Sequence, residues 1–286
     1  MNRAPLGNAA YWEGRVRKLS ERIEADKSNM GFPSKNPGTE SQYWFHHSRY
    51  SFRLIMLRYS RGDDVDDLLQ HSFEDLLDSW SHANLRALEW QRAGGKRDSR
   101  EWLQSLHNLN FYNWCFWVAG VALLLEVPDE QWERLVKLIG NEGRDRLLDM
   151  VISSRQRTRK IGSAILHPQP YARLMHALSS PRSQKGAALA LFVQHWYAEL
   201  ARPAEQRLWW YLYGDPQRHP LEKGGYFGRW CIEAAVVAKV FDIDDTACLS
   251  HEHYPGALVH PESPYLPVYH RESSLLSLLK RLVSPA

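Results

Sequence analysis

Histidines are the first side chains to test for chemistry, because imidazole binds metals and transfers protons near neutral pH. They cluster at His46-His47 and at His251-Glu252-His253, with His260 and His270 further along. Neither an H-E-x-x-H helix nor paired C-x-x-C motifs, the spacings typical of zinc sites, occur in the chain. We therefore expect no metal and no other cofactor, and we interpret the loop histidines as packing or hydrogen-bonding residues. An enzyme with a metal in the His251–His260 loop stays an open alternative.

The other chemical motifs are also incomplete. Gly224-Gly225-Tyr226-Phe227-Gly228 precedes a predicted helix, but it lacks the G-x-G-x-x-G spacing and no strand comes before it. We interpret it as a glycine turn in which aromatic rings pack against the backbone. The nucleophile motif G-x-S-x-G is absent, and Cys115 and Cys231 lie in apolar helical sequence, where burial makes a thiol inert. The chain is therefore predicted not to be an enzyme.

Charge is distributed unevenly along a chain that is nearly neutral in total, with 36 basic and 33 acidic residues. Between Arg61 and Trp80 seven acids stand against one base, a local charge of −6. If one helix begins at Asp63 or Asp64, four of these acids share a face opposite an apolar stripe. We predict that this segment binds a partner; a solvated face with helix-capping acids is the alternative. The candidate partner-binding residues are Asp63, Asp64, Asp66, Asp67, Glu74, Asp75 and Asp78.

The middle of the chain has the opposite charge. From Met150 to Ala198 there is no acid, and seven basic residues give this stretch a local charge of +7. A nucleic-acid-binding or regulatory helical protein that uses residues 155–185 is therefore the alternative function. A patch that complements a protein partner, or the acidic half of this chain, is equally compatible. The seven residues are Arg155, Arg157, Arg159, Lys160, Arg173, Arg182 and Lys185.

These charges must be positioned by helices, because apolar residues recur at helical spacing almost throughout. The clearest stripe runs from Val65 to Trp80, and further helices are predicted over residues 42–59, 99–125, 171–178, 185–200 and 226–241. Residues 156–161 form a short, basic and polar segment, and Pro168 and Pro170 follow it, so we place the boundary between two halves there. We predict an all-α fold of eight to ten helices in two packed helical halves. They are an N-terminal helical domain over residues 1–155 and a C-terminal helical domain over residues 156–286.

One segment, between Glu101 and Glu126, carries no charge and raises the question of a membrane helix. Its fully apolar part, Trp114–Leu125, is too short to cross ~30 Å of hydrocarbon, and the amide of Asn113 would be costly there. We predict a buried core helix and no membrane partner. Three cysteines without C-x-x-C spacing, and an N-terminus without an apolar signal segment, predict a cytoplasmic protein.

Several segments of the chain, in order, resemble a known family. Residues 225–239 read GYFGRWCIEAAVVAK, and their order with the segments after them closely resembles the C-terminal signature of the PoNi-type immunity family. The Trp196-Tyr197 pair is similar to an upstream helix of that signature, and Tyr50–Asp66 resembles the family's N-terminal domain. The resemblance spans roughly residues 43–260. Its later segments are 241–246, 254–255 and 258–260.

The signature residues are interpreted as structural. Glu233, an acid in an apolar helix, is expected to be buried and paired, with an arginine as the candidate partner. Gly256-Ala257 stands where the family pattern has an Asp before Leu-Val-His, which leaves the identity of any toxin open. The full set is Trp196, Tyr197, Tyr226, Trp230, Glu233, Asp244, Asp245, Tyr254, Pro255 and His260.

The resemblance implies a role in competition between bacteria. Members of the family protect the producing cell by binding a secreted toxin, commonly a nuclease effector of a type VI secretion system. We therefore expect a cognate toxin as partner, stoichiometric inhibition and no direct contact with nucleic acid; a homo-oligomer stays open. Because a nuclease carries a basic cleft for nucleic acid, the acidic segment is expected to occupy that cleft as a mimic of phosphate.

Overall fold

The computed structural model describes residues 2–29, 37–94 and 105–262. These residues form ten α-helices, three short 3₁₀ turns and no strand, which confirms the predicted all-α fold and the number of helices. The helices are α1 (Ala9–Asn29), α2 (Pro37–Arg61), α3 (Ser72–Arg92), α4 (Leu109–Leu124), α5 (Asp129–Ile139), α6 (Arg146–Ser153), α7 (Pro168–Ser179), α8 (Arg182–Glu199), α9 (Ile232–Val240) and α10 (Gly256–Val259).

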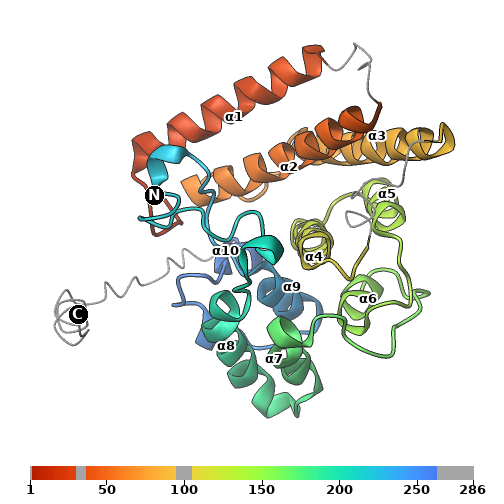
Figure 1. The fold of residues 1–286 in the computed structure, drawn as a ribbon. Coiled ribbons are helices and arrows are strands. Elements are labelled where there is room, and N and C mark those ends of the chain that lie inside the picture. Colours follow the sequence, from red (N-terminus) through yellow and green to blue (C-terminus); the bar gives the residue numbers. More distant parts are fainter. Residues whose placement is uncertain (1, 30–36, 95–104, 263–286) are drawn as a thin grey trace, which may run out of the picture.

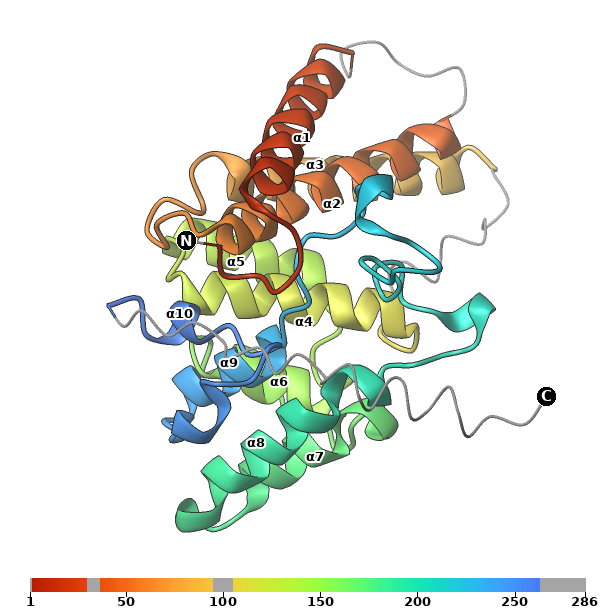
Figure 2. The same ribbon diagram turned by 90° about the vertical axis from the view of Figure 1, so that its left-hand side faces the viewer.

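The helices form two groups with α4 between them. In Figures 1 and 2, α1, α2 and α3 make up the upper part of the molecule and α6 to α9 the lower part. α2 and α3 run antiparallel along each other, and the Ser41 hydroxyl at the start of α2 donates to the Ala83 carbonyl of α3 at 2.9 Å. α1 packs on α2, and α7 packs on α8.

The uncharged segment is the central helix, as predicted. Every residue of α4 from Phe111 to Leu124 is buried. The Asn108 side chain caps this helix by accepting hydrogen bonds from the backbone N–H groups of Asn110 and Phe111. The helix therefore begins later than the predicted Ser99, which lies outside the described residues. No helix in the described part of the chain is both long and apolar enough to cross a membrane.

Aromatic and small residues join α4 to both groups. On one side the Trp114 ring lies 5.7 Å from Phe45, 5.4 Å from Phe52 and 5.6 Å from Trp80, centroid to centroid. On another side Gly120 faces Ile232 of α9, close enough that a methyl group would not fit. The buried apolar residues thus form one continuous core from Ala4 to Leu258. The division at residues 155/156 stays a prediction, since both parts contribute to this core.

The predicted helix over the acidic segment begins too early. Residues 62–71 form irregular turns, and α3 starts only at Ser72, after His71 in the left-handed region at φ 53°. Gly62 leaves α2 at φ 101°, a conformation that favours glycine. The Asp63 carboxylate contacts the arginines behind it and does not cap a new helix. Val65 and Leu68 are buried all the same, so their helical spacing reflects turns that face the core.

The predicted helix over residues 226–241 is also too long. Residues 224–231 are irregular, and α9 begins at Ile232. The backbone of this stretch is engaged elsewhere: the Tyr226 carbonyl accepts from the Tyr11 hydroxyl, and the Phe227 carbonyl accepts from the Ser60 hydroxyl, both at 2.8 Å. These hydrogen bonds tie the stretch to α1 and α2, and an α-helix here would break them.

The surroundings of two helical glycines, one in the contact of α4 with α9 and one on the surface of α1, predict opposite effects of substitution by alanine. In Gly120→Ala the new methyl carbon would lie 2.7 Å from Cγ2 of Ile232, which is buried and cannot withdraw. We expect a loss of about 1–3 kcal/mol in the free energy of unfolding, in spite of the better helix propensity of alanine. Gly14→Ala in α1, where nothing lies within 4 Å, should gain up to about 1 kcal/mol. Urea unfolding of both variants measures this, and equal stability would contradict close α4–α9 packing.

Candidate partner-binding surface

The seven predicted acids do not share one helix face. Four lie in the turns before α3 and three in its first two turns. Asp63 is held by two arginines, with Arg58 Nε at 3.0 Å and Arg61 Nη2 at 2.6 Å. Partial burial alone would raise the pKa of Asp63, but the hydrogen bonds from Arg61 and Arg58 keep it below its usual value. This carboxylate therefore fixes the end of α2.

The three acids of α3 also serve internal contacts. Glu74 and Asp78 both pair with Arg134 of α5, and Gln131 Nε2 donates to Glu74 at 2.9 Å. Asp75 pairs with Lys27 of α1 at 2.6 Å. These contacts attach α3 to α5 and α1, and they offset part of the negative charge that the sequence places here.

Three of the seven acids remain available. Asp64, Asp66 and Asp67 are exposed, and none forms an ion pair with any part of the chain that the structure describes. Asp64 accepts a hydrogen bond from the backbone N–H of Asp66 at 3.1 Å, and Asp67 accepts one from Gln70 Nε2 at 2.6 Å. We call these three residues the acidic loop. Its local hydrogen bonds hold the carboxylates in place and leave their charge uncompensated.

A groove of about 330 Å³, lined by both apolar and charged side chains, opens directly beside the acidic loop. Its polar members are Asp66, Glu126 and Lys239, and Lys239 Nζ bridges the Leu124 carbonyl and the Glu126 carboxylate, at 2.8 Å each. That pairing lowers the pKa of Glu126. Four segments far apart in sequence build the groove, so no local pattern could predict it. The lining residues are Val65, Asp66, Leu69, Leu124, Leu125, Glu126, Lys239, Leu258 and Pro261.

The basic stretch is largely neutralised as well. Arg159 forms a buried ion pair with Asp149 at 2.7 Å. Three more of its arginines reach acids elsewhere in the chain, and only Arg157, Lys160 and Lys185 have no ion pair within the described residues. Four of the seven basic residues are thus paired with acids, which weakens the argument from local charge for the nucleic-acid alternative. The other three pairs are Arg155 with Asp129, Arg173 with Glu199, and Arg182 with Asp242.

The aromatic signature residues lie inside the molecule. Trp196 is fully buried and stacks on Trp210 at 5.7 Å between centroids. Trp230 is also buried, and its indole N–H donates to the Ser60 hydroxyl at 2.8 Å. Tyr226 packs against the Trp12 ring of α1 at 5.7 Å, and the half-buried Tyr197 stacks on Tyr211 at 4.5 Å. Each ring joins segments that are distant in sequence.

Glu233 is fully buried, as expected, but the expectation of an arginine partner is wrong. Its carboxylate accepts from Asn113 Nδ2 of α4 at 3.0 Å and from the Tyr171 hydroxyl of α7 at 3.1 Å. The Asn113 carbonyl oxygen in turn accepts from the Trp210 indole at 2.9 Å. Burial without a nearby cation raises the pKa of Glu233 to about 7.

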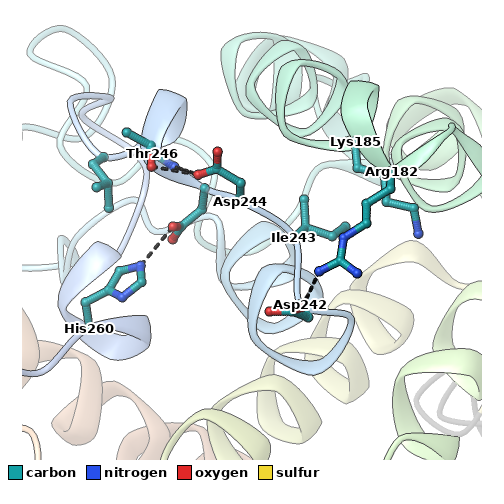
Figure 3. A pocket seen from close by; sticks show the side chains of 9 residues that line it. Arg182, Lys185, Asp242, Ile243, Asp244, Thr246 and His260 are labelled. Atoms are coloured by element: carbon teal, nitrogen blue, oxygen red, sulfur yellow. Dashed lines mark hydrogen bonds and ion pairs between the residues drawn. The ribbon is translucent and has the colours of Figure 1, made fainter.

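The remaining signature residues close the C-terminal end of the described chain. Asp244 accepts from the Thr246 hydroxyl at 2.6 Å, and His260 Nε2 contacts Asp245 at 2.8 Å (Figure 3). The Tyr254 hydroxyl also donates to Asp245. Pro255 is buried and precedes α10. The exposed Arg182–Asp242 pair in the same view joins α8 to the turn after α9.

The loop histidines do not converge on a common point. His253 is buried, and burial lowers its pKa to about 3. His251 contacts the backbone N–H of His253 at 3.2 Å, whereas His260 faces Asp245. Across residues 2–29, 37–94 and 105–262 no group of three or more histidine, cysteine or acidic side chains is arranged to hold a metal ion. The geometry thus gives no support to a metal enzyme in this loop.

Comparison with known proteins covers nearly the whole described chain. The family model of the N-terminal part of PoNe immunity proteins (PoNi) matches residues 3–137, and that of their C-terminal part matches residues 143–258. No curated protein matches the chain. Among solved structures, the crystal structure of protein PA2201 from Pseudomonas aeruginosa has a TM-score of 0.67 over 91% of this chain and 91% of that chain. At 19% sequence identity, this likeness shows a shared fold.

The raised pKa of Glu233 predicts a pH-dependent stability. A carboxyl group with a pKa near 7 in the folded state and 4.5 when unfolded stabilises the fold fully below about pH 4.5, and this contribution is lost as the pH rises through 7. Glu233 should therefore lower the wild-type free energy of unfolding by about 2–3 kcal/mol between pH 5 and pH 8, while the lowered pKa of His253 acts in the opposite direction over the same range. Because Glu233→Gln removes only the first contribution, its stability should gain about 2–3 kcal/mol relative to the wild type between pH 5 and pH 8.

Urea unfolding at several pH values between 5 and 8 measures both slopes. Glu130→Gln on the exposed face of α5 is the matched control, and it should retain the wild-type slope. A Glu233→Gln variant with the same pH dependence as the wild type would show that Glu233 is not the titrating group.

Proposed function

The chain belongs to the family of PoNe immunity proteins (PoNi), and we propose that it binds a cognate nuclease toxin and neutralises it by stoichiometric inhibition. The toxin is an effector of a type VI secretion system in this proposal, and the protein acts by binding alone, without catalysis. Family membership supports the role of an immunity protein. The described surface supports a specific binding site for the toxin.

The acidic loop is the observation that carries this site. Asp64, Asp66 and Asp67 present three carboxylates whose charge no ion pair within the described residues compensates. A nuclease must attract phosphates to a basic cleft, so such a loop can enter the cleft in place of nucleic acid. The other four predicted acids are engaged in contacts within the fold. We therefore narrow the proposed site from seven acids to these three.

In this proposal the groove beside the acidic loop supplies the lasting affinity that complementary charges alone do not provide. Complementary charges mainly accelerate encounter, whereas lasting affinity comes from apolar side chains that fill a pocket and exclude water. Leu69 and Leu125 are half-buried at the groove, directly beside Asp66. In the proposed complex an apolar side chain of the toxin occupies the groove while basic residues around it face the acidic loop.

The cytoplasm is the proposed location, because a toxin that cleaves nucleic acid must be stopped there. All three cysteines are free and buried, which is compatible with a reducing compartment. Whether the protein acts as a monomer or a homo-oligomer does not affect the proposed site.

Removing the charge of the acidic loop should slow toxin binding. The variant Asp64→Asn, Asp66→Asn, Asp67→Asn keeps side-chain oxygens for the local hydrogen bonds and removes three charges. At low ionic strength we expect an association rate constant about tenfold or more below the wild-type value, with a weaker dependence on salt. Surface plasmon resonance with the catalytically inactivated product of the neighbouring toxin gene measures both quantities.

The matched control is Glu21→Gln, Glu205→Gln, Glu222→Gln, which removes three exposed charges from other parts of the surface. It should associate at the wild-type rate, and both variants should unfold at similar temperatures. Cells that express the active toxin should survive with the control and lose protection with the acidic-loop variant when the immunity protein is expressed at a low level. Equal association rates for all three proteins would refute the acidic loop as the binding site.

A further inference from the structure

Three half-buried arginines of α1 and α2 have no acidic partner among the described residues. Arg15, Arg49 and Arg53 are half-buried, and none forms an ion pair with a described residue. The Nε atom of each is buried without a hydrogen-bond partner. We call these residues the arginine cluster. Two other arginines below the surface, Arg58 and Arg159, contact carboxylates, whereas Arg229 also lacks an ion pair within the described residues and lies over the rings of Tyr197 and Tyr226.

Aromatic rings hold two of these guanidinium groups in place. Arg49 lies 4.9 Å from the Phe45 ring centroid and 5.0 Å from that of Trp209. Arg53 lies 5.8 Å from the centroids of both Tyr213 and Phe227. Stacking on rings orients a guanidinium plane and leaves its edge N–H groups free to bind an anion.

Two consecutive glycines let the third arginine and a histidine approach the same turn. The Arg15 guanidinium lies where a Cβ atom of Gly224 would be, and His219 Nε2 lies where that of Gly225 would be. Arg53 Nη2 donates to the Gly225 carbonyl at 3.3 Å. Three groups that carry or can gain positive charge therefore contact the Gly224-Gly225 turn. His219 Nε2 is itself buried without a hydrogen-bond partner.

This arrangement costs energy unless an anion is present. Burial lowers the pKa of Arg53, and the neighbouring charge of Arg15 lowers it further. Burial together with the charges of Lys223 and Arg53 lowers the pKa of His219. Glu222, an acid that acts on Tyr11 beside this region, is exposed and forms no ion pair with any described residue. The turn therefore concentrates positive charge that the described chain does not balance.

We propose that Arg15, Arg53 and His219, at the Gly224-Gly225 turn, form a binding site for an oxyanion of the phosphate type, with Arg49 adding positive charge from the next turn of α2. A phosphate group accepts several hydrogen bonds at once from guanidinium edges and carries enough charge to offset the cluster. The site is separate from the acidic loop and does not depend on the proposed binding of a toxin.

The test is thermal unfolding in phosphate against chloride. At pH 7.5 and constant ionic strength, 10 mM inorganic phosphate should raise the Tm of the full chain by about 3 °C relative to sodium chloride, if its Kd is on the order of 1 mM. Arg15→Gln, which changes a half-exposed side chain of α1, should reduce this rise to less than a third of its size. Arg53→Met should abolish it while keeping a near wild-type Tm in chloride, because the variant removes an uncompensated charge.

Arg17→Gln is the matched control, since it removes the same charge from the same helix two residues away, where Arg17 is exposed beside Glu21. It should respond to phosphate as the wild type does. Equal Tm values in phosphate and chloride for the wild type would overturn the proposal. So would a phosphate response in Arg15→Gln that matches the one in Arg17→Gln.

Discussion

A helix that is buried around its whole circumference needs packing partners on every side, and α4 is such a helix. From Phe111 to Leu124 it exposes no residue to solvent, so α2, α3, α5 and α9 must all reach it. Aromatic rings fill the wide space towards α2 and α3, whereas Gly120 allows α9 to come close. The arrangement of the other helices follows from this requirement, and the two halves of the chain therefore share one core.

The one amide buried in the middle of α4 adds a second constraint. Asn113 has to satisfy both a donor and an acceptor without water, and it does so with Glu233 and Trp210. Glu233 also binds Tyr171, so one small polar cluster fixes the relative positions of α4, α7, α9 and the loop that carries Trp210. The cost is a carboxyl group without a cation, which explains its raised pKa. The same packing brings the Leu124 carbonyl within 2.8 Å of Lys239 Nζ, and both residues line the groove next to the acidic loop.

Much of the fold could be predicted from the sequence because helical periodicity and the absence of charge report burial directly. The all-α class, the central helix and the burial of Glu233 follow from such local signals. Helix starts were predicted less well, since the segments after Gly62 and Gly224 are shaped by contacts with distant residues. The candidate site was only partly predictable. A local charge of −6 shows that acids gather, but Arg134 and Lys27, which form ion pairs with three of them, come from other helices. The arginine cluster gave no signal, because its members are spread over two helices and two of them contact a glycine turn that is distant in sequence.

Ion pairing, and not charge density along the sequence, decides which charges are free to act on another molecule. The acidic and basic stretches both look like binding sites in the sequence. Most of their charged residues nevertheless form ion pairs with residues elsewhere in the fold. Charges that pair within the fold stabilise it and contribute little at long range, because the field of a close pair falls off quickly. Among the charges left unpaired within the described chain are a set of carboxylates at one turn and a set of guanidinium groups at another. A nearly neutral protein can thus present two local fields of opposite sign, and each selects a partner of the opposite charge independently of the other.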